Sequence, residues 1–183
     1  MTSRRQAGFT LIELLVTMGI AALLLTLSAG AVRVFFLNQS LEGATDELVT
    51  QMREQQEDSV AQAFPLIFGV GVSAGRNDFT LFSFDPGADS SSTADDSCEA
   101  TTRSFDAGMF SVGARVASET IANDPAAPEY AECAGLPGVV NDQIVFFYAR
   151  GTATGGTIVL EQPGIDRQRT ITVSAASGRV TRS

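Results

Sequence analysis

Residues 8–16 read Gly8-Phe9-Thr10-Leu11-Ile12-Glu13-Leu14-Leu15-Val16, and an apolar run follows to Val32 without another charged side chain. Leucine, alanine and isoleucine dominate the run and proline is absent, so we expect an α-helix. At about 1.5 Å per residue, residues 9–32 would form a helix of roughly 36 Å. A hydrocarbon core is about 30 Å thick, so the sequence predicts a membrane-spanning helix.

Glu13 is the only charged residue within this apolar run. A carboxylate costs roughly 2.5–3.5 kcal/mol at the centre of a membrane segment and less near the interface, so a partner cation is expected. Cleavage between Gly8 and Phe9 would create a free amine at Phe9, and that amine would be able to neutralise Glu13 of a neighbouring subunit. Arg4 and Arg5 precede the run and predict, by the positive-inside rule, that the rest of the chain lies outside the cytoplasm.

Residues 4–16, with the sequence RRQAGFTLIELLV, resemble the class III signal of type IV pilins and type II secretion pseudopilins. In that family a membrane prepilin peptidase cuts after the glycine and methylates the new N-terminal residue. The resemblance implies cleavage between Gly8 and Phe9, N-methylation of Phe9 and an assembly role for the charge of Glu13. The alternative is an ordinary secretory signal cleaved near Ala29-Gly30-Ala31, and Glu13 inside the apolar region argues against it.

The pattern divides the chain into four segments. Residues 1–8 are expected to be a cleaved cytoplasmic leader, and residues 9–32 a transmembrane helix that becomes the core of a filament. Residues 33–64 continue the helix with an amphipathic character, and residues 65–183 form a β-rich head. The first proline, Pro65, predicts that the helix ends near Ala63. The expected apolar stripe of the second helical half contains Leu37, Leu41, Leu48, Met52 and Val60.

The head is expected to consist mainly of antiparallel strands, because strand patterns alternate with turn residues and no helical pattern intervenes. The fold class is therefore α+β, a long helix packed on an antiparallel sheet, and the resemblance makes it pilin-like. Irregular chain is predicted for a polar acidic loop at 85–104 and for 119–138. Strands are predicted at 66–72, 79–84, 143–149, 157–161, 169–173 and 179–181, with one or two more within 104–116.

Two features of the polar loops leave alternatives open. Asp85, Asp89, Asp95 and Asp96 are either a solvated acidic surface or a calcium site, since hard cations prefer several oxygen ligands. Cys98 and Cys133 both fall in the part expected outside the cytoplasm, where a disulfide is permitted, and the alternative is two unpaired thiols.

No catalytic constellation is present. The chain contains no histidine, which excludes Ser-His-Asp and Cys-His catalysis and the histidine-containing zinc motifs. We therefore expect no enzyme activity and no cofactor, and we assign no metal-binding residue, with calcium at the acidic loop left as the alternative given above. The net charge of −9 over 183 residues also argues against general affinity for nucleic acid.

The C-terminal half is similar to the closing strands of the H-type minor pseudopilins and FimT-like minor pilins (the GspH/FimT family), in residues 156–160, 169–173 and 178–180. This resemblance implies a minor structural subunit of a type II secretion pseudopilus or a type IV pilus. The expected location is the bacterial inner membrane as a single-pass protein, and then the filament. The implied partners are prepilin peptidase, other pilin subunits, an inner-membrane assembly platform and the lipid bilayer.

Two alternatives of function remain. One is a DNA-binding minor pilin, because residues 178–182 resemble the Gly-Arg-x-Arg tail of FimT-like DNA binders, although one extra residue separates the arginines. The other is a membrane-anchored binding protein that does not polymerise. The candidate phosphate contacts of the first alternative are Arg167, Arg169, Arg179 and Arg182, and the opposing interpretation is that they are ordinary surface arginines on an acidic head.

Overall fold

The computed structural model describes residues 10–62, 66–87, 96–105, 113–136 and 143–183. Helix α1 (Leu11–Ala61) confirms the predicted long N-terminal helix. The positions at which the helix was expected to begin and end, Phe9 and Ala63, lie outside the described residues. The chain divides into two units within α1, the first ending at Phe36 and the second beginning at Leu37.

The second unit contains two four-stranded sheets and one short helix. The first sheet has the order β3-β2-β1-β5, and the second has the order β4-β6-β7-β8. Every neighbouring pair of strands in both sheets is antiparallel, which confirms the predicted arrangement. The elements are β1 (Ile67–Val72), β2 (Asp78–Asp85), β3 (Ser97–Ser104), β4 (Arg115–Ile121), α2 (Pro128–Ala134), β5 (Gln143–Phe147), β6 (Gly156–Glu161), β7 (Gln168–Val173) and β8 (Val180–Arg182).

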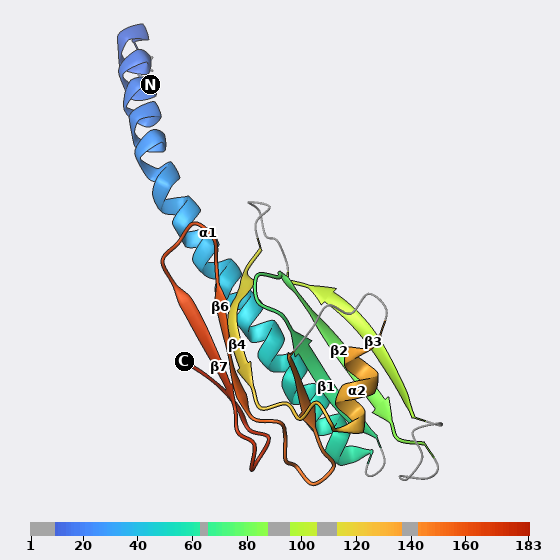
Figure 1. Cartoon of the computed structure of the whole chain (residues 1–183). Coiled ribbons are helices and arrows are strands. Elements are labelled where there is room, and N and C mark those ends of the chain that lie inside the picture. The colour runs from blue at the N-terminus through green and yellow to red at the C-terminus, as the bar shows by residue number, and fades with distance from the viewer. Residues whose placement is uncertain (1–9, 63–65, 88–95, 106–112, 137–142) are drawn as a thin grey trace, which may run out of the picture. The chain divides into compact units, whose positions relative to one another are not determined.

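The part of α1 that begins at Leu37 packs on both sheets (Figure 1). Leu41, Leu48 and Met52 are fully buried, in one core with Val70 of β1 and Ile158 of β6. The predicted apolar stripe is therefore confirmed from Leu37 to Met52. It is wrong at Val60, which is half exposed, because the adjacent Ser59 and not Val60 lies on the buried face at that turn.

Two hydroxyl-bearing residues, Thr45 and Ser59, share the buried face of α1. The side chain of Thr45 donates a hydrogen bond to the carbonyl oxygen of Leu41 at 2.7 Å, and that of Ser59 donates to Gln56 at 2.8 Å. Burial of a hydroxyl is costly only when it lacks a partner, so these two residues fit into the core.

The first sheet is covered on both faces. Val70 and Val72 of β1 belong to the core that contains α1, whereas Phe82 and Phe84 of β2 belong to a second cluster with Cys133 of α2. This double cover explains why β1 is buried along nearly its whole length instead of alternating between buried and exposed residues.

Gly69 makes room for one aromatic ring in this sheet. It lies opposite Phe146 in the register of β1 and β5. A Cβ atom at position 69 would come within 2.9 Å of the Phe146 ring and 3.2 Å of Ile144 Cγ2. The glycine is thus required by packing on the face that the first sheet presents to α2.

Six of the predicted strands are confirmed to within two residues at each end. Three predictions for residues 85–138 are wrong in part. Residues 97–104 form strand β3 and not a loop, because β2 supplies a complete ladder of backbone partners to this polar edge. Of the one or two strands predicted within 104–116, the structure shows Arg115 and Val116 as the start of β4, which continues to Ile121 in a segment predicted to be irregular. Residues 106–112 lie outside the described residues. The third is the helix α2, in a segment predicted to be irregular.

Candidate functional site

The first turn of α1 places Glu13 close to the start of the helix. The amide of Glu13 donates to Oγ1 of Thr10 at 3.4 Å, and the amide of Leu14 donates to the carbonyl oxygen of Thr10 at 3.2 Å. Thr10 and Glu13 thus have the spacing of a capping box, in which a hydroxyl and an acidic side chain serve the first free amides. A carboxylate is also favourable at this end of the helix dipole. Gly8 and Phe9 lie outside the described residues.

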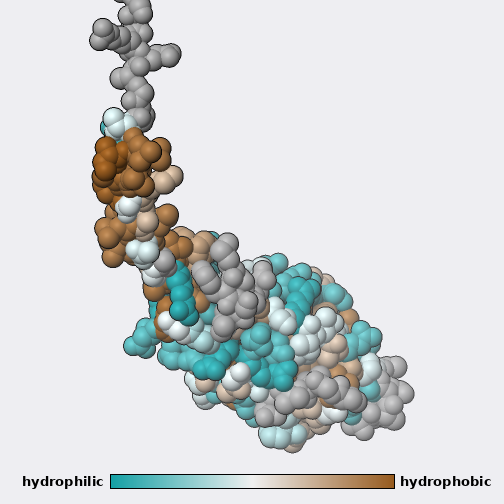
Figure 2. All heavy atoms as spheres, turned by 90° about the horizontal axis from the view of Figure 1, so that it is seen from above, coloured by the Kyte–Doolittle hydropathy of each residue, from teal (hydrophilic) through white to brown (hydrophobic). Residues whose placement is uncertain are grey.

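The helical surface after Glu13 is apolar on all sides. The sequence has no charged residue between Glu13 and Arg33, and Figure 2 shows mostly hydrophobic side chains on the face of this segment that is in view. Among the described residues, α1 is the helix that is long and apolar enough to cross a membrane. The exposed large side chains are Leu11, Ile12, Leu14, Leu15, Val16, Met18, Ile20, Leu23, Leu24, Leu25, Leu27, Val32, Val34 and Phe35.

The hydroxyl groups of this helical segment are satisfied within the helix. Thr17 donates to Leu14 O at 2.9 Å, and Thr26 donates to Leu23 O at 2.8 Å. Ser28 makes the equivalent bond within its own turn at 3.0 Å. Because no hydroxyl of these three depends on water, the surface is suited to lipid or to a packed bundle of helices.

A second candidate site joins α1 to the C-terminal strands. We call it the arginine seam, and it consists of Asn38, Glu42 and Asp46 on α1 and Arg167, Arg169 and Arg182 on and beside β7 and β8. The three helical residues are spaced by four and so share one face of the helix. Arg169 Nε donates to Glu42 Oε1 at 3.0 Å, and Arg182 forms an ion pair with Asp46.

Arg167 completes the seam at its N-terminal end. Its Nη1 donates to Asn38 Oδ1 at 3.1 Å, and its Nη2 lies 3.5 Å from Glu42 Oε1. Two arginines therefore share one carboxylate. The hydrogen bond from Arg169 is the largest cause that lowers the pKa of Glu42; partial burial opposes it, and the charges of Arg169, Arg167 and Arg182 lower the pKa further.

The seam accounts for three of the four arginines that the sequence singled out as candidate phosphate contacts. Arg179 does not join it, and it forms no ion pair within the described parts of the chain. Arg179 immediately precedes the buried Val180 of β8, whereas Arg182 lies two residues beyond Val180. The alternation of a strand therefore directs Arg182 toward the same side as Val180. The sequence analysis missed the helical partners, although the spacing of Asn38, Glu42 and Asp46 was visible in the sequence.

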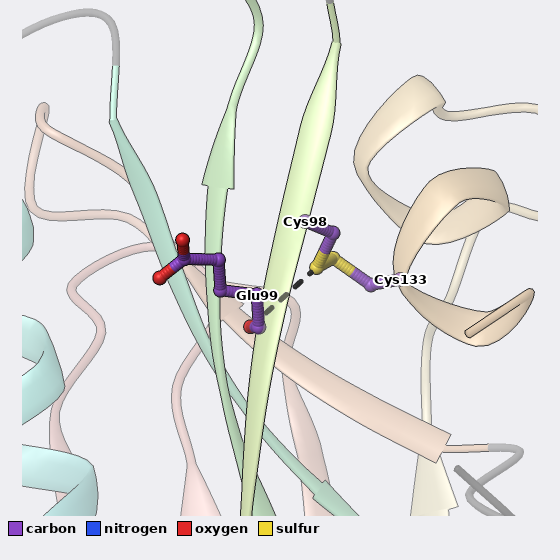
Figure 3. The surroundings of a disulfide bond; sticks show 3 residues. All are labelled: Cys98, Glu99 and Cys133. Carbon is purple, nitrogen blue, oxygen red and sulfur yellow. Dashed lines mark hydrogen bonds between the residues drawn. A yellow bond between two sulfur atoms is a disulfide. The ribbon is translucent and has the colours of Figure 1, made fainter. Parts of the chain in front are cut away.

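A disulfide connects Cys98 of β3 to Cys133 of α2 (Figure 3). The two Cα atoms are 5.3 Å apart and the residues are separated by 35 positions in the chain. Sγ of Cys98 also lies 3.8 Å from the carbonyl oxygen of Glu99, as a contact only, because a disulfide sulfur carries no hydrogen. The bond fastens the short helix to the outermost strand of the first sheet.

The calcium hypothesis for the acidic loop is only partly covered by the structure. Asp89 and Asp95 lie outside the described residues, whereas Asp85 ends β2 and Asp96 directly precedes β3. Within the described residues no three acidic or cysteine side chains lie close enough together to hold a metal ion.

The N-terminal sequence matches a known family description. A family profile for the prokaryotic N-terminal methylation motif matches residues 3–29, a range that includes Gly8, Phe9 and Glu13. The fold agrees, because a structure of the minor pseudopilin EpsH from the type 2 secretion system of Vibrio cholerae superposes with a TM-score of 0.50. The chain carries a prokaryotic N-terminal methylation motif on a pilin-like fold. The superposition covers 79% of this pilin-like chain and 96% of EpsH at 12% sequence identity. Because the identity is so low, the match shows a shared fold and nothing further.

A second structure of the Vibrio cholerae minor pseudopilin EpsH has a TM-score of 0.48, with 11% identity over 79% of this chain and 93% of that one. No curated protein sequence matches this pilin-like chain significantly. The motif together with the apolar α1 indicates a membrane-anchored protein with a head domain.

Proposed function

We propose that this protein is a minor subunit of a type II secretion pseudopilus or a type IV pilus, of the H-type. The observation that carries the proposal is the methylation motif at the start of a helix whose surface is apolar from Leu14 to Val32. Such a surface is stable in lipid before assembly and in a helical bundle after it.

The proposed route has three steps. The helix inserts into the inner membrane with Arg4 and Arg5 in the cytoplasm and the head outside. Prepilin peptidase then cuts between Gly8 and Phe9 and methylates the amine of Phe9. The assembly platform finally lifts the subunit into the filament, where Glu13 pairs with the terminal amine of a neighbouring subunit in surroundings of low dielectric constant.

Mass spectrometry of the N-terminus, on protein purified from its own host, tests the route. The proposal expects a mature chain that begins with N-methylated Phe9. A chain that begins at Ala31 or Val32 would show instead that the apolar segment is a discarded secretory signal.

The DNA-binding alternative has less support. Arg167, Arg169 and Arg182 are each engaged with α1, so two carboxylates already balance part of their charge. A salt-dependent shift of duplex DNA by the protein, lost on changing Arg179 and Arg182, would favour this alternative. A protein that is processed at Gly8 but never found in a filament would favour the membrane-anchored binding protein.

A further inference from the structure

A cavity of about 400 Å³ lies beside the first residues of α2. Most of its walls are apolar, with Ile67 of β1, Phe84 of β2 and Pro128 of α2 among them. Its volume falls in the range of about 300–1,000 Å³ that is usual for ligand sites, and such sites combine apolar walls with a few placed polar groups.

The polar side chains of this cavity, which we call the α2 pocket, are Glu129, Tyr148, Arg150 and Thr152. Glu129 is only 8% exposed, and the hydroxyl of Tyr148 donates to its Oε1 at 2.9 Å. Burial, and then the charge and hydrogen bond of Glu129, raise the pKa of Tyr148, so the phenol stays a neutral donor. Within the described residues no arginine forms an ion pair with Glu129.

We propose that the α2 pocket receives a lysine or arginine side chain of a partner protein. The aliphatic stem would lie against Phe84 and Pro128, and the cationic group would bind the buried carboxylate of Glu129. An arriving cation is strongly attracted to a carboxylate in an apolar wall, because the apolar surroundings screen the attraction between the two charges only weakly. The net charge of −9 also attracts a basic partner surface at long range.

Two further features of the pocket bear on the proposal. Arg150 is exposed, so its positive charge opposes an arriving cation only weakly. The disulfide at Cys133 fastens the other end of α2 to β3, and so fixes the helix that carries Glu129. The proposed contact does not depend on cleavage or polymerisation, so its failure would leave the proposed function untouched.

The chain contains two tyrosines and no tryptophan, which gives a direct optical readout of the pocket. In a Tyr130→Phe background the remaining fluorescence comes from Tyr148. We would titrate the full chain, in a non-ionic detergent, with n-pentylguanidine and separately with 1-pentanol and hexanoate as neutral and anionic probes. We expect a saturable fluorescence change with n-pentylguanidine, weaker binding of 1-pentanol and no binding of hexanoate.

Matched variants isolate the carboxylate. Glu129→Gln should weaken n-pentylguanidine binding about tenfold or more, since it removes a charge-assisted hydrogen bond, and should leave 1-pentanol unchanged. Arg150→Ala should strengthen n-pentylguanidine binding slightly. Glu132→Gln, at an exposed site on the same helix, should leave n-pentylguanidine binding unchanged. Equal affinity for n-pentylguanidine and 1-pentanol, or an unchanged affinity in Glu129→Gln, would overturn the proposal.

Discussion

Arg169 of β7 donates from Nε to Oε1 of Glu42 on α1 across 3.0 Å, over a separation of 127 residues. The contact fixes the helix to the second sheet at the edge of the core, where Leu41 is already buried. The side chains of Arg169 and Glu42 are 24% and 37% exposed, so water weakens their attraction.

Removing this carboxylate should destabilise the protein slightly. We expect Glu42→Gln to lower the free energy of unfolding by about 0.5–1 kcal/mol at pH 7 and low salt, because two arginines lose one partner. Urea unfolding of the full chain in detergent, followed by circular dichroism, measures the change. Glu57→Gln, at an exposed position of α1, serves as the control and should leave the free energy unchanged.

The effect of Glu42→Gln should also depend on pH. The folded pKa of Glu42 lies below its ordinary value of 4.5, so its ionised form adds stability at pH values above 4.5. That contribution is lost as the pH falls through the lowered pKa. The difference between the unchanged protein and Glu42→Gln should therefore be complete at neutral pH and shrink below about pH 4.5. A difference that grows in acid would contradict the ion pair.

The disulfide should contribute more than the ion pair. A bond that closes a loop of this length stabilises a protein by about 3–4 kcal/mol in the chain-entropy model. We expect the double variant Cys98→Ser with Cys133→Ser to lose a similar free energy of unfolding. Reduction of the unchanged protein should reproduce the loss, whereas the same reductant should have no effect on the double variant.

The N-terminal helix and most of the strands were predictable because local sequence decides them. An apolar run without proline leaves α1 few alternatives, and alternation between turns marks β6 and β7. Val60 was misplaced because the buried position of that turn is held by Ser59, a polar residue that an apolar pattern passes over. Only the packed head shows which face of the helix is covered there.

The failures share a physical cause in tertiary contacts. The side chains of β3 are almost all polar, and the strand exists because the backbone of β2 and the bond at Cys98 hold it. Helix α2 has only seven residues and begins at Pro128, so its pattern is too short to recognise. The arginine seam joins residues more than 120 positions apart, and spacing on one element could not identify its partner on the other.

Two glycines should respond in opposite directions to a methyl group. Gly69→Ala should destabilise the head by about 1–3 kcal/mol, because the new Cβ meets the Phe146 ring at 2.9 Å within a packed sheet. Gly43→Ala should stabilise it by up to about 1 kcal/mol, since no atom beyond its chain neighbours and the nearby backbone of its own helix lies within 4 Å of the new Cβ, and alanine favours the helix. Thermal unfolding of both variants tests the pair, and a stabilised Gly69→Ala would refute the close packing of β1 on β5.

The charge of Glu13 and its place in the helix cap can be separated by substitution. Glu13→Gln keeps a residue that suits a capping box but removes the negative charge, whereas Thr10→Val removes the hydroxyl bonded to the Glu13 amide and keeps the charge. If the carboxylate meets a neighbouring amine, Glu13→Gln should insert and be processed normally but enter filaments at least tenfold less often, and Thr10→Val should assemble nearly normally. Quantitative immunoblots of membrane and sheared filament fractions from the native host measure how much of each variant is inserted in the membrane and how much enters filaments. Normal incorporation of Glu13→Gln together with loss in Thr10→Val would assign Glu13 to helix capping, and the charge-pairing account would have to be abandoned.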